Sequence, residues 1–173
     1  MIELEKTYLV KELLDLTNCK YKDMLDIYIP KGVTHPTLRI RKNGDKYEMT
    51  KKEPVEDDLS KQLEITITLS KEEFEELAQI EGKRVYKKRY LFEYNGRVAE
   101  IDVFKEMLEG LVLVDFEFEK EDEKDEFKMP DFCLADVTYE EFTAGGMLGG
   151  KVYSDIEADL ARFNYKKIDT QLL

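Results

Sequence analysis

The chain has few of the residues on which many catalytic and metal sites depend. Its 173 residues contain no tryptophan, one histidine and two cysteines. Because His35 is the single histidine, a zinc site built from several histidines is excluded. Cys19 and Cys133 are far apart and in no CxxC spacing, so we expect two free thiols, buried or half-buried, and no redox motif.

Long apolar runs and positive charge are also scarce. No segment approaches the roughly 20 apolar residues that a membrane-spanning helix needs, and the N-terminal MIELEKTYLV lacks the basic-then-apolar layout of a signal peptide. The chain has 27 Lys and Arg against 39 Asp and Glu, a net charge of −12. Nucleic-acid binding needs a basic face. We therefore expect a cytoplasmic protein that binds neither membranes nor nucleic acid, although this charge does not exclude a local basic cavity.

The sequence does contain many short segments that alternate in the manner of β-strands. Eight of them are separated by turn residues, and the Asn-Gly pairs at 43–44 and 95–96 are strong hairpin signals. The predicted strands are residues 2–10, 25–30, 36–42, 46–52, 61–69, 84–94, 97–104 and 110–119.

Short helices are predicted at three places. Ser70 should cap the first, with Glu73 completing a capping box. A second is expected near 139–143, and a third at about 154–163 with Ser154 as its cap.

These elements predict a mainly β member of the α+β class. We expect an eight-stranded antiparallel β-barrel with flanking short helices. A single domain should cover residues 1–173, with a C-terminal helical segment at about 152–165. The glycine-rich GGMLGG at 145–150 is interpreted as a flexible turn, because it lacks the lysine and the preceding strand of a phosphate loop.

The strands alternate charged with apolar residues, and this allows two interpretations. Leu38 and Ile40 share one face of their strand, and Arg39 and Arg41 share the other. The first interpretation is a sandwich whose polar face lies in water. The second is a barrel turned inside out, whose charged faces line a wet interior. Acids and bases are segregated onto different strands and are not mixed as on a solubilising surface, which favours the second.

A charged interior would suit a polyphosphate bound together with a metal ion. Glu3 with Glu5, and Asp115 with Glu117, would supply the carboxylate oxygens that Mg²⁺ or Mn²⁺ prefers. Arginine and lysine would bind phosphate oxygens, and the candidates for this patch are Arg39, Arg41, Lys52 and Arg89. Reaction at phosphorus needs mainly positioning and charge neutralisation. The sequence has no G-x-S-x-G, no Walker-type loop and no Cys/His pair that would indicate another mechanism.

The ordered set of these segments resembles the CYTH superfamily, also called triphosphate tunnel metalloenzymes. The segments are IELEKTYLV, LRIRKNGDKYEMTKK, KKRY followed by EIDVF, GLVLVDFEFE and DVTYEEF, and they extend to about residue 150. The resemblance implies an eight-stranded β-barrel that forms a tunnel, and dependence on Mg²⁺ or Mn²⁺. Members of the superfamily hydrolyse inorganic triphosphate, thiamine triphosphate or RNA 5′-triphosphates, or convert ATP to cyclic AMP.

The resemblance also implies roles for individual residues. The substrate-binding residues that it implies are Arg39, Arg41, Lys52 and Arg89. The metal ligands that it implies are Glu3, Glu5, Glu64, Asp102, Asp115 and Glu117. Catalytic roles are implied for Glu5, Lys52 and Arg89. All the residues named in this paragraph match motifs of the family. In chain order these motifs are E-x-E-x-K, R-x-R, a strand that ends in lysine, the middle E-x-E, K-x-R-Y, E-x-D and a pair of acids.

Three positions depart from the family pattern. Thr7 stands in place of a lysine, Gln62 in place of an arginine and Thr66 in place of an acid. We predict a metal-dependent hydrolase of tripolyphosphate or another small triphosphate, as a monomer or homodimer. Two alternatives stay open: a non-catalytic module that binds polyphosphate or nucleotides, and a class IV adenylyl cyclase.

Overall fold

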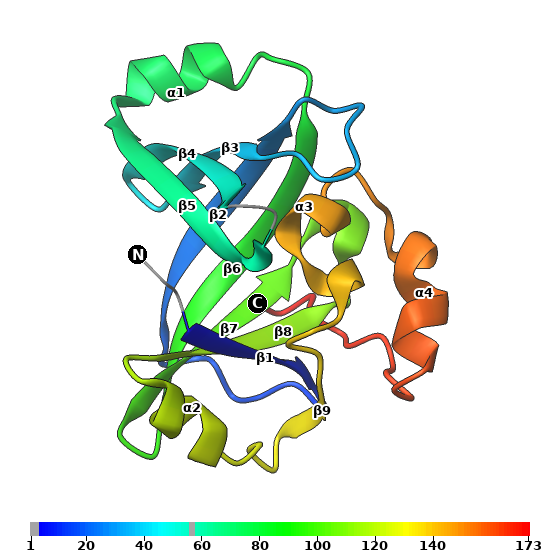
Figure 1. The fold of residues 1–173 in the computed structure, drawn as a ribbon. Helices are drawn as coiled ribbons and strands as arrows, with labels where there is room; N and C mark the ends of the chain where they lie inside the picture. The colour runs from blue at the N-terminus through cyan, green and yellow to red at the C-terminus, as the bar shows by residue number, and fades with distance from the viewer. Residues whose placement is uncertain (1–3, 56–57) are drawn as a thin grey trace. The chain divides into compact units, whose positions relative to one another are not determined.

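The computed structural model describes residues 4–55 and 58–173, apart from the side chains of residues 53–62. The strands are β1 (Leu4–Val10), β2 (Lys20–Ile29), β3 (Leu38–Asn43), β4 (Lys46–Val55), β5 (Asp58–Leu69), β6 (Lys83–Tyr94), β7 (Arg97–Phe104), β8 (Val112–Phe118) and β9 (Cys133–Asp136). The helices are α1 (Lys71–Leu77), α2 (Glu121–Glu126), α3 (Gly145–Leu148) and α4 (Tyr153–Ala161), with 3₁₀ turns at Glu106–Leu108 and Glu141–Thr143 (Figure 1).

The nine strands belong to one sheet, with the order β5-β4-β3-β2-β6-β7-β8-β1-β9. The predicted class, a mainly β fold with an antiparallel sheet and short flanking helices, is confirmed. The described residues form nine strands and not eight. In the described residues the hydrogen-bonded order also runs from β5 to β9 without closing on itself.

The strand that the sequence pattern did not reveal is β9. It has four residues and pairs antiparallel with β1, with Val10 opposite Cys133. Four residues are too few for an alternation that can be recognised in the sequence. Because β9 lies beside β1, both edges of β1 are paired, since its other neighbour is β8.

The described residues form two compact units. Unit 1 consists of Asp23–Tyr86 and Ala144–Gly150. Unit 2 consists of the described residues up to Lys22 together with Lys87–Thr143 and Lys151–Leu173. Strands β2 and β6 each contribute residues to both units. A single domain over residues 1–173 stays a prediction.

Each unit has its own apolar core. In unit 1, Ile27 of β2 and Ile40 of β3 are fully buried and belong to one cluster with Phe74 of α1. In unit 2, the ring of Phe116 packs against Tyr8, with ring centroids 6.2 Å apart. The buried residues alternate along their strands with charged ones, so each unit also has a charged sheet face opposite its apolar face.

The exposure of the charged side chains decides between the two interpretations of the alternation. On a sheet face in water, these side chains would be exposed. Instead, the side chains of Arg39 and Arg41 are 16% and 17% exposed, and that of Asp102 is 2% exposed. The central charged side chains of both faces are therefore withdrawn from water, which favours the second interpretation, whereas Glu5 and Glu117 are exposed and the Lys52 side chain is 37% exposed.

Both Asn-Gly pairs mark tight turns, but the first lies one residue later than predicted. Asn95 and Gly96 have φ values of 49° and 76° between β6 and β7, as a type I′ turn requires. Asn43 is instead the last residue of β3. The β3–β4 loop consists of Gly44, with φ of 60°, and Asp45.

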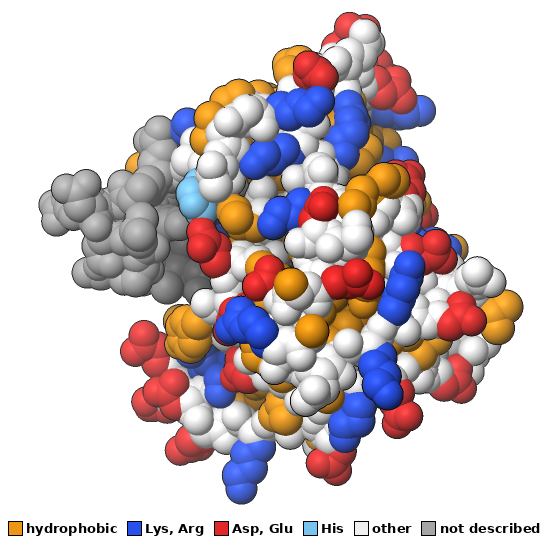
Figure 2. All heavy atoms as spheres, turned by 90° about the vertical axis from the view of Figure 1, so that its right-hand side faces the viewer, with side chains coloured by type: hydrophobic (Ala, Val, Ile, Leu, Met, Phe, Trp, Pro, Cys, Tyr) orange, Lys and Arg blue, Asp and Glu red, His pale blue; other side chains and the backbone are white. Residues whose placement is uncertain are grey.

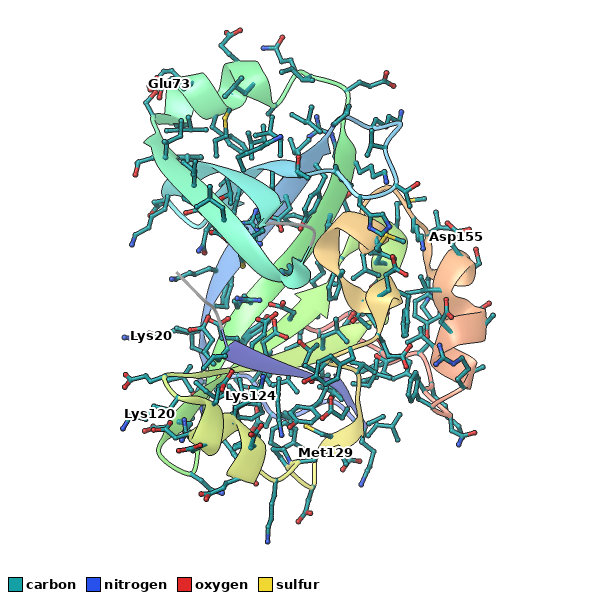
Figure 3. All side chains as sticks on the ribbon, in the orientation of Figure 1. Lys20, Glu73, Lys120, Lys124, Met129 and Asp155 are labelled. Atoms are coloured by element: carbon teal, nitrogen blue, oxygen red, sulfur yellow. The ribbon has the colours of Figure 1, made fainter. Side chains whose placement is uncertain are left out.

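The first predicted helix starts as expected and the last does not; Figure 3 labels Glu73 of α1 and Asp155 of α4. Ser70 Oγ accepts a hydrogen bond from the Glu73 N–H at 3.1 Å, and the Glu73 carboxylate accepts one from the Ser70 N–H at 2.7 Å. At α4, the capping oxygen comes from Asp155, which accepts from the Val152 N–H at 2.9 Å. Ser154 therefore lies inside the helix and is not its cap.

Other expectations about single residues are also answered. Cys133 is buried, Cys19 is half-buried and both thiols are free, as predicted. His35 is exposed. GGMLGG contains the short helix α3 and is not simply a turn. Among the helices that the structure describes, none has the length and apolar character needed to cross a bilayer.

Strand β5 has an exposed apolar side. Leu63, Ile65 and Ile67 are 53%, 55% and 53% exposed. They alternate with Glu64 and Thr66, which belong to the charged face of unit 1. Since β5 is one end of the strand order, only one of its edges is paired in the described part of the chain.

Gly145 of α3 lies so close to Tyr28 of β2 that a Cβ at this position would clash with the Tyr28 hydroxyl. We expect Gly145→Ala to lower the free energy of unfolding by about 1–3 kcal/mol, because α3 or the tyrosine ring must shift. Gly32→Ala is the control, since a Cβ there meets nothing within 4 Å. Urea unfolding of both variants measures the difference, and equal losses would contradict the expectation.

Candidate active site

The residues predicted to form the site lie on two charged faces, one in each unit. The face of unit 1 carries Arg39, Arg41, Lys52 and Glu64. The face of unit 2 carries Glu5, Arg89, Asp102, Asp115 and Glu117. Glu3 lies outside the described residues.

Arg41 is held by a buried carboxylate. Asp26 of β2 is directly opposite Arg41 of β3 in the antiparallel ladder and is 3% exposed. Its two oxygens accept hydrogen bonds from Nε at 2.6 Å and from Nη2 at 2.7 Å. A contact through two parallel hydrogen bonds fixes the plane of the guanidinium group.

Arg39 shares this face with Arg41 but is held much more loosely. Its Nη2 is 3.4 Å from the Thr50 hydroxyl and 3.8 Å from the Glu48 carboxylate, and its Nε is buried without a hydrogen-bond partner. Tyr28 lies opposite Arg39 on β2. Burial, with the charge of Asp26 adding to it, raises the pKa of Tyr28 to about 12, so its hydroxyl keeps its proton at neutral pH. Arg39 also makes a side-chain hydrogen bond with Tyr28, so the hydrogen-bonding capacity that its neighbours leave unused is that of its buried Nε.

Lys52 of β4 is paired with the residue directly opposite, Glu64 of β5. The Lys52 Nζ is 2.8 Å from a Glu64 oxygen. Burial alone would raise the pKa of Glu64, but the hydrogen bond and the charge of Lys52 outweigh it and lower that pKa overall. Thr66, one of the departures from the family pattern, donates to Glu64 at 3.1 Å and lies 3.0 Å from the Thr50 hydroxyl. The threonine thus orients Glu64 at a place where the family pattern has a second acid.

The charged face of unit 2 is centred on Asp102 of β7. Arg89 of β6 is directly opposite, and its Nε and Nη2 donate to the two Asp102 oxygens at 2.7 Å each. Lys87 also donates to this carboxylate. Burial alone would raise the pKa of Asp102, but the charges of Lys87 and Arg89 lower it from 3.8 to about 2. Asp102 is therefore ionised at neutral pH and compensates two cations.

Arg89 connects Asp102 to two further acids. Its Nη2 lies 3.0 Å from Asp115, and it also pairs with Glu100. Burial raises the pKa of both Glu100 and Asp115, and the charge of Arg89 partly offsets this. Thr7, where the family pattern has a lysine, donates its hydroxyl to Asp115 at 2.7 Å. The network therefore extends over four neighbouring strands, from β6 to β1.

At the other end of this face, two exposed acids lie opposite each other. Glu5 of β1 is the register partner of Glu117 of β8. Like charges directly opposite each other destabilise a sheet, and a cation between them would remove the repulsion. Carboxylate oxygens are the ligands that hard cations such as Mg²⁺ and Mn²⁺ take. The donor set at this end therefore fits such an ion.

The balance of charge on the unit 2 face also fits a cation. Among its described residues, carboxylates outnumber cations, since Glu5, Glu100, Asp102, Asp115 and Glu117 share the face with Lys87 and Arg89. Among the residues that the structure describes, no three His, Cys, Asp or Glu side chains are already arranged around a common point to hold a metal ion. Lys87 and Arg89 contact the inner carboxylates Glu100, Asp102 and Asp115, while Glu5 and Glu117 lie at the other end of the face.

The structure divides the predicted basic patch. Arg39, Arg41 and Lys52 lie in unit 1, whereas Arg89 lies in unit 2 among carboxylates. The expected segregation of acids from bases holds along β3 and β8 but not along β4, which carries both Glu48 and Lys52. Each of these cations also has a carboxylate on an adjacent strand. Figure 2 likewise shows acidic and basic side chains interspersed on the face that it displays.

The charged residues of these faces that were missed as site residues include Asp26, Glu48, Lys87 and Glu100. Lys87 precedes Arg89 by two residues, and Glu100 precedes Asp102 by two. The strand period of two was thus sufficient to place both on the charged face. Asp26 could have been found from a different signal in the sequence, because it is the one charged residue in the apolar segment LDIYI.

Comparison with known proteins shows similarity to one family. A sequence model of the CYTH domain matches residues 1–129. An inorganic triphosphatase of Nitrosomonas europaea is 35% identical over 145 residues, 80% of this chain and 90% of that protein. The crystal structure of an inorganic triphosphatase has a TM-score of 0.66 and 28% identity, covering 88% of this chain and 97% of that one.

A protein of Bacillus halodurans is similar in fold alone, with a TM-score of 0.52 and 16% identity over 98% of this chain and 94% of that one. The sequence match of residues 1–129 covers well over half of the chain. It includes every described residue that was predicted for the site, from Glu5 to Glu117. The chain therefore belongs to the CYTH domain family.

Proposed function

We propose that the chain is a metal-dependent inorganic triphosphatase, a phosphohydrolase that cleaves a phosphoanhydride bond of tripolyphosphate. The observation that carries the proposal is the 35% identity to an inorganic triphosphatase over most of both proteins. The two charged faces support it. One offers arginine and lysine for phosphate oxygens, and the other offers an excess of carboxylates for a metal ion.

In this proposal the unit 1 face binds the polyphosphate. Arg39 and Arg41 contribute planar guanidinium groups, each able to bind two phosphate oxygens, and Lys52 contributes a point charge. Glu64 orients Lys52 through their 2.8 Å contact. Because the side chains of Arg39 and Arg41 are largely withdrawn from water, their interaction with charge that develops on phosphate is stronger than it would be on an exposed surface.

The unit 2 face is proposed to hold Mg²⁺ or Mn²⁺. The family is metal-dependent, and Glu5, Asp115 and Glu117 are the proposed ligands, with Glu3, Glu64 and Asp102 as the further members of the predicted set. When bound, such an ion neutralises phosphate charge and polarises the bond that breaks. Thr7 orients Asp115 by its hydrogen bond.

The proposed catalytic residues are Glu5, Lys52 and Arg89. Reaction at phosphorus needs positioning and charge neutralisation more than a protein nucleophile. Lys52 would neutralise a phosphate oxygen. Arg89, which is also proposed to contact phosphate, fixes the carboxylates of Asp102 and Asp115. Glu5 would help to hold the metal ion on the same face, where it lies opposite Glu117.

The test is phosphate release from tripolyphosphate by the whole chain, with Mg²⁺ and with Mn²⁺. We expect turnover with at least one of them. Tripolyphosphate and metal at 100 times the dissociation constant should also stabilise the fold by about 2.7 kcal/mol. The proposal would be refuted if both turnover and the thermal shift were absent with each metal.

The same experiment separates the alternatives. A thermal shift without phosphate release would identify a non-catalytic binding module, and Thr7→Lys is the variant in which to look for restored turnover. Cyclic AMP formed from ATP would identify an adenylyl cyclase.

A further inference from the structure

We propose that Asp26 is a positioning residue for anion binding: it holds Arg41 in one orientation, so that the two arginines of β3 have different tasks. Arg41 is oriented before the anion arrives, and Arg39 completes its hydrogen bonds only with the anion. This inference rests on the proposed function, because the anion is a polyphosphate bound at the unit 1 face.

The first argument is the geometry of the Asp26 contact. Both oxygens of Asp26 are used by Arg41, through Nε at 2.6 Å and Nη2 at 2.7 Å. The two residues are register partners on adjacent strands, so the sheet itself sets their separation. A guanidinium group bound along its Nε–Nη2 edge has its opposite edge directed away from Asp26. Asp26 thus determines which edge of Arg41 an anion can approach.

The second argument is the contrast with Arg39. This side chain has the same low exposure as Arg41, 16% against 17%. The contacts of its Nη2 are longer, at 3.4 Å and 3.8 Å. It also makes a side-chain hydrogen bond with Tyr28, but its buried Nε has no hydrogen-bond partner. Buried donors are nearly always satisfied in folded proteins. An oxygen-rich anion would supply the missing acceptor at Arg39.

The third argument is charge. Arg39, Arg41 and Lys52 are matched on their face by Asp26, Glu48 and Glu64, three cations against three carboxylates. A buried carboxylate at Asp26 weakens the attraction of this face for an anion. Net charge therefore does not explain why Asp26 is there, whereas a fixed orientation of Arg41 does.

Steady-state kinetics of tripolyphosphate hydrolysis test the inference. Asp26→Asn keeps the size of the side chain but removes its charge, so Arg41 loses its fixed orientation while the face becomes more positive. We expect kcat to fall by about 10- to 100-fold, with KM unchanged or lower. Asp26→Glu restores the charge and should recover part of kcat.

The control is Asp23→Asn on the same strand. Asp23 accepts a hydrogen bond from the Tyr86 hydroxyl at 2.9 Å, and the β2 residues opposite the two arginines are Asp26 and Tyr28. We expect its kinetics per folded molecule to match those of the unchanged protein. Asp26→Asn with unchanged kcat, or with a raised KM and unchanged kcat, would overturn the inference. The inference would also be overturned if Asp26→Asn reduced only the yield of folded protein.

A second measurement needs neither turnover nor an Asp26 variant. In the ¹⁵N-labelled protein, Arg39→Lys and Arg41→Lys assign the two arginine Nε–H signals. Tripolyphosphate added without a divalent metal should shift the Arg39 signal and leave the Arg41 signal in place. Equal shifts, or none, would overturn the inference. Lack of hydrolysis together with the expected shift would refute the proposed activity but support the different tasks of the arginines.

Discussion

Replacing Asp102 by alanine is expected to lower the free energy of unfolding by about 3–5 kcal/mol, because two buried cations lose their common counter-charge. Asp102 is the carboxylate that both Lys87 and Arg89 contact, and its side chain is 2% exposed. The lowered pKa of Asp102 has the same cause, namely its contacts with Lys87 and Arg89. Since its pKa is lower in the folded chain, the stabilisation is present above pH 3.8 and is lost as the pH falls towards 2.

Urea unfolding at neutral pH without added metal measures this loss. Asp122→Ala is the matched control, because Asp122 is an exposed acid of α2 and its removal should change stability by less than about 0.5 kcal/mol. A loss at Asp102 no larger than that of the control would mean that the buried network does not stabilise unit 2.

The two arginines of β3 should respond in opposite ways to replacement by alanine. Arg41→Ala leaves the buried Asp26 carboxylate without its two-point partner, so we expect a loss of about 3–5 kcal/mol of stability. Arg39→Ala removes a buried Nε that has no hydrogen-bond partner. We expect its stability to be unchanged within about 0.5 kcal/mol, while kcat/KM for tripolyphosphate falls by about 100-fold or more.

Each variant serves as the control for the other, since both remove one arginine from the same strand face. Unfolding curves and tripolyphosphate hydrolysis are measured on the same preparations. Equal stability of the two variants would contradict the assigned strength of the Asp26–Arg41 pair. Full activity of Arg39→Ala would remove Arg39 from the substrate-binding residues.

Local sequence signals predicted much of the fold because they depend on neighbours in the chain. The Ser70 and Glu73 capping box and the Asn95-Gly96 turn are fixed within four residues, and both are confirmed. Alternation in strands of six or more residues was also sufficient. The four-residue β9 was missed because it is recognisable only by its pairing with β1.

The candidate site was predictable as a list of charged residues but not as a set of pairs. Alternation placed Arg39 and Arg41 on one face, yet nothing within β3 distinguishes them. The difference comes from β2, where the register places Asp26 opposite one and Tyr28 opposite the other. Likewise, Arg89 was grouped with the other cations because its carboxylate partners come from β7 and β8. Such pairings depend on which strands are adjacent, and the sequence pattern does not specify that.

The apolar side of β5 has a practical consequence for work with this protein. Leu63, Ile65 and Ile67 form a row of high β-propensity on a strand with one unpaired edge in the described residues. The unpaired backbone edge is a template on which a second chain can add a strand, and the exposed apolar side chains beside it favour aggregation. In concentrated stocks, aggregation should therefore begin at the unpaired edge of β5. Storage conditions should be chosen to limit this aggregation.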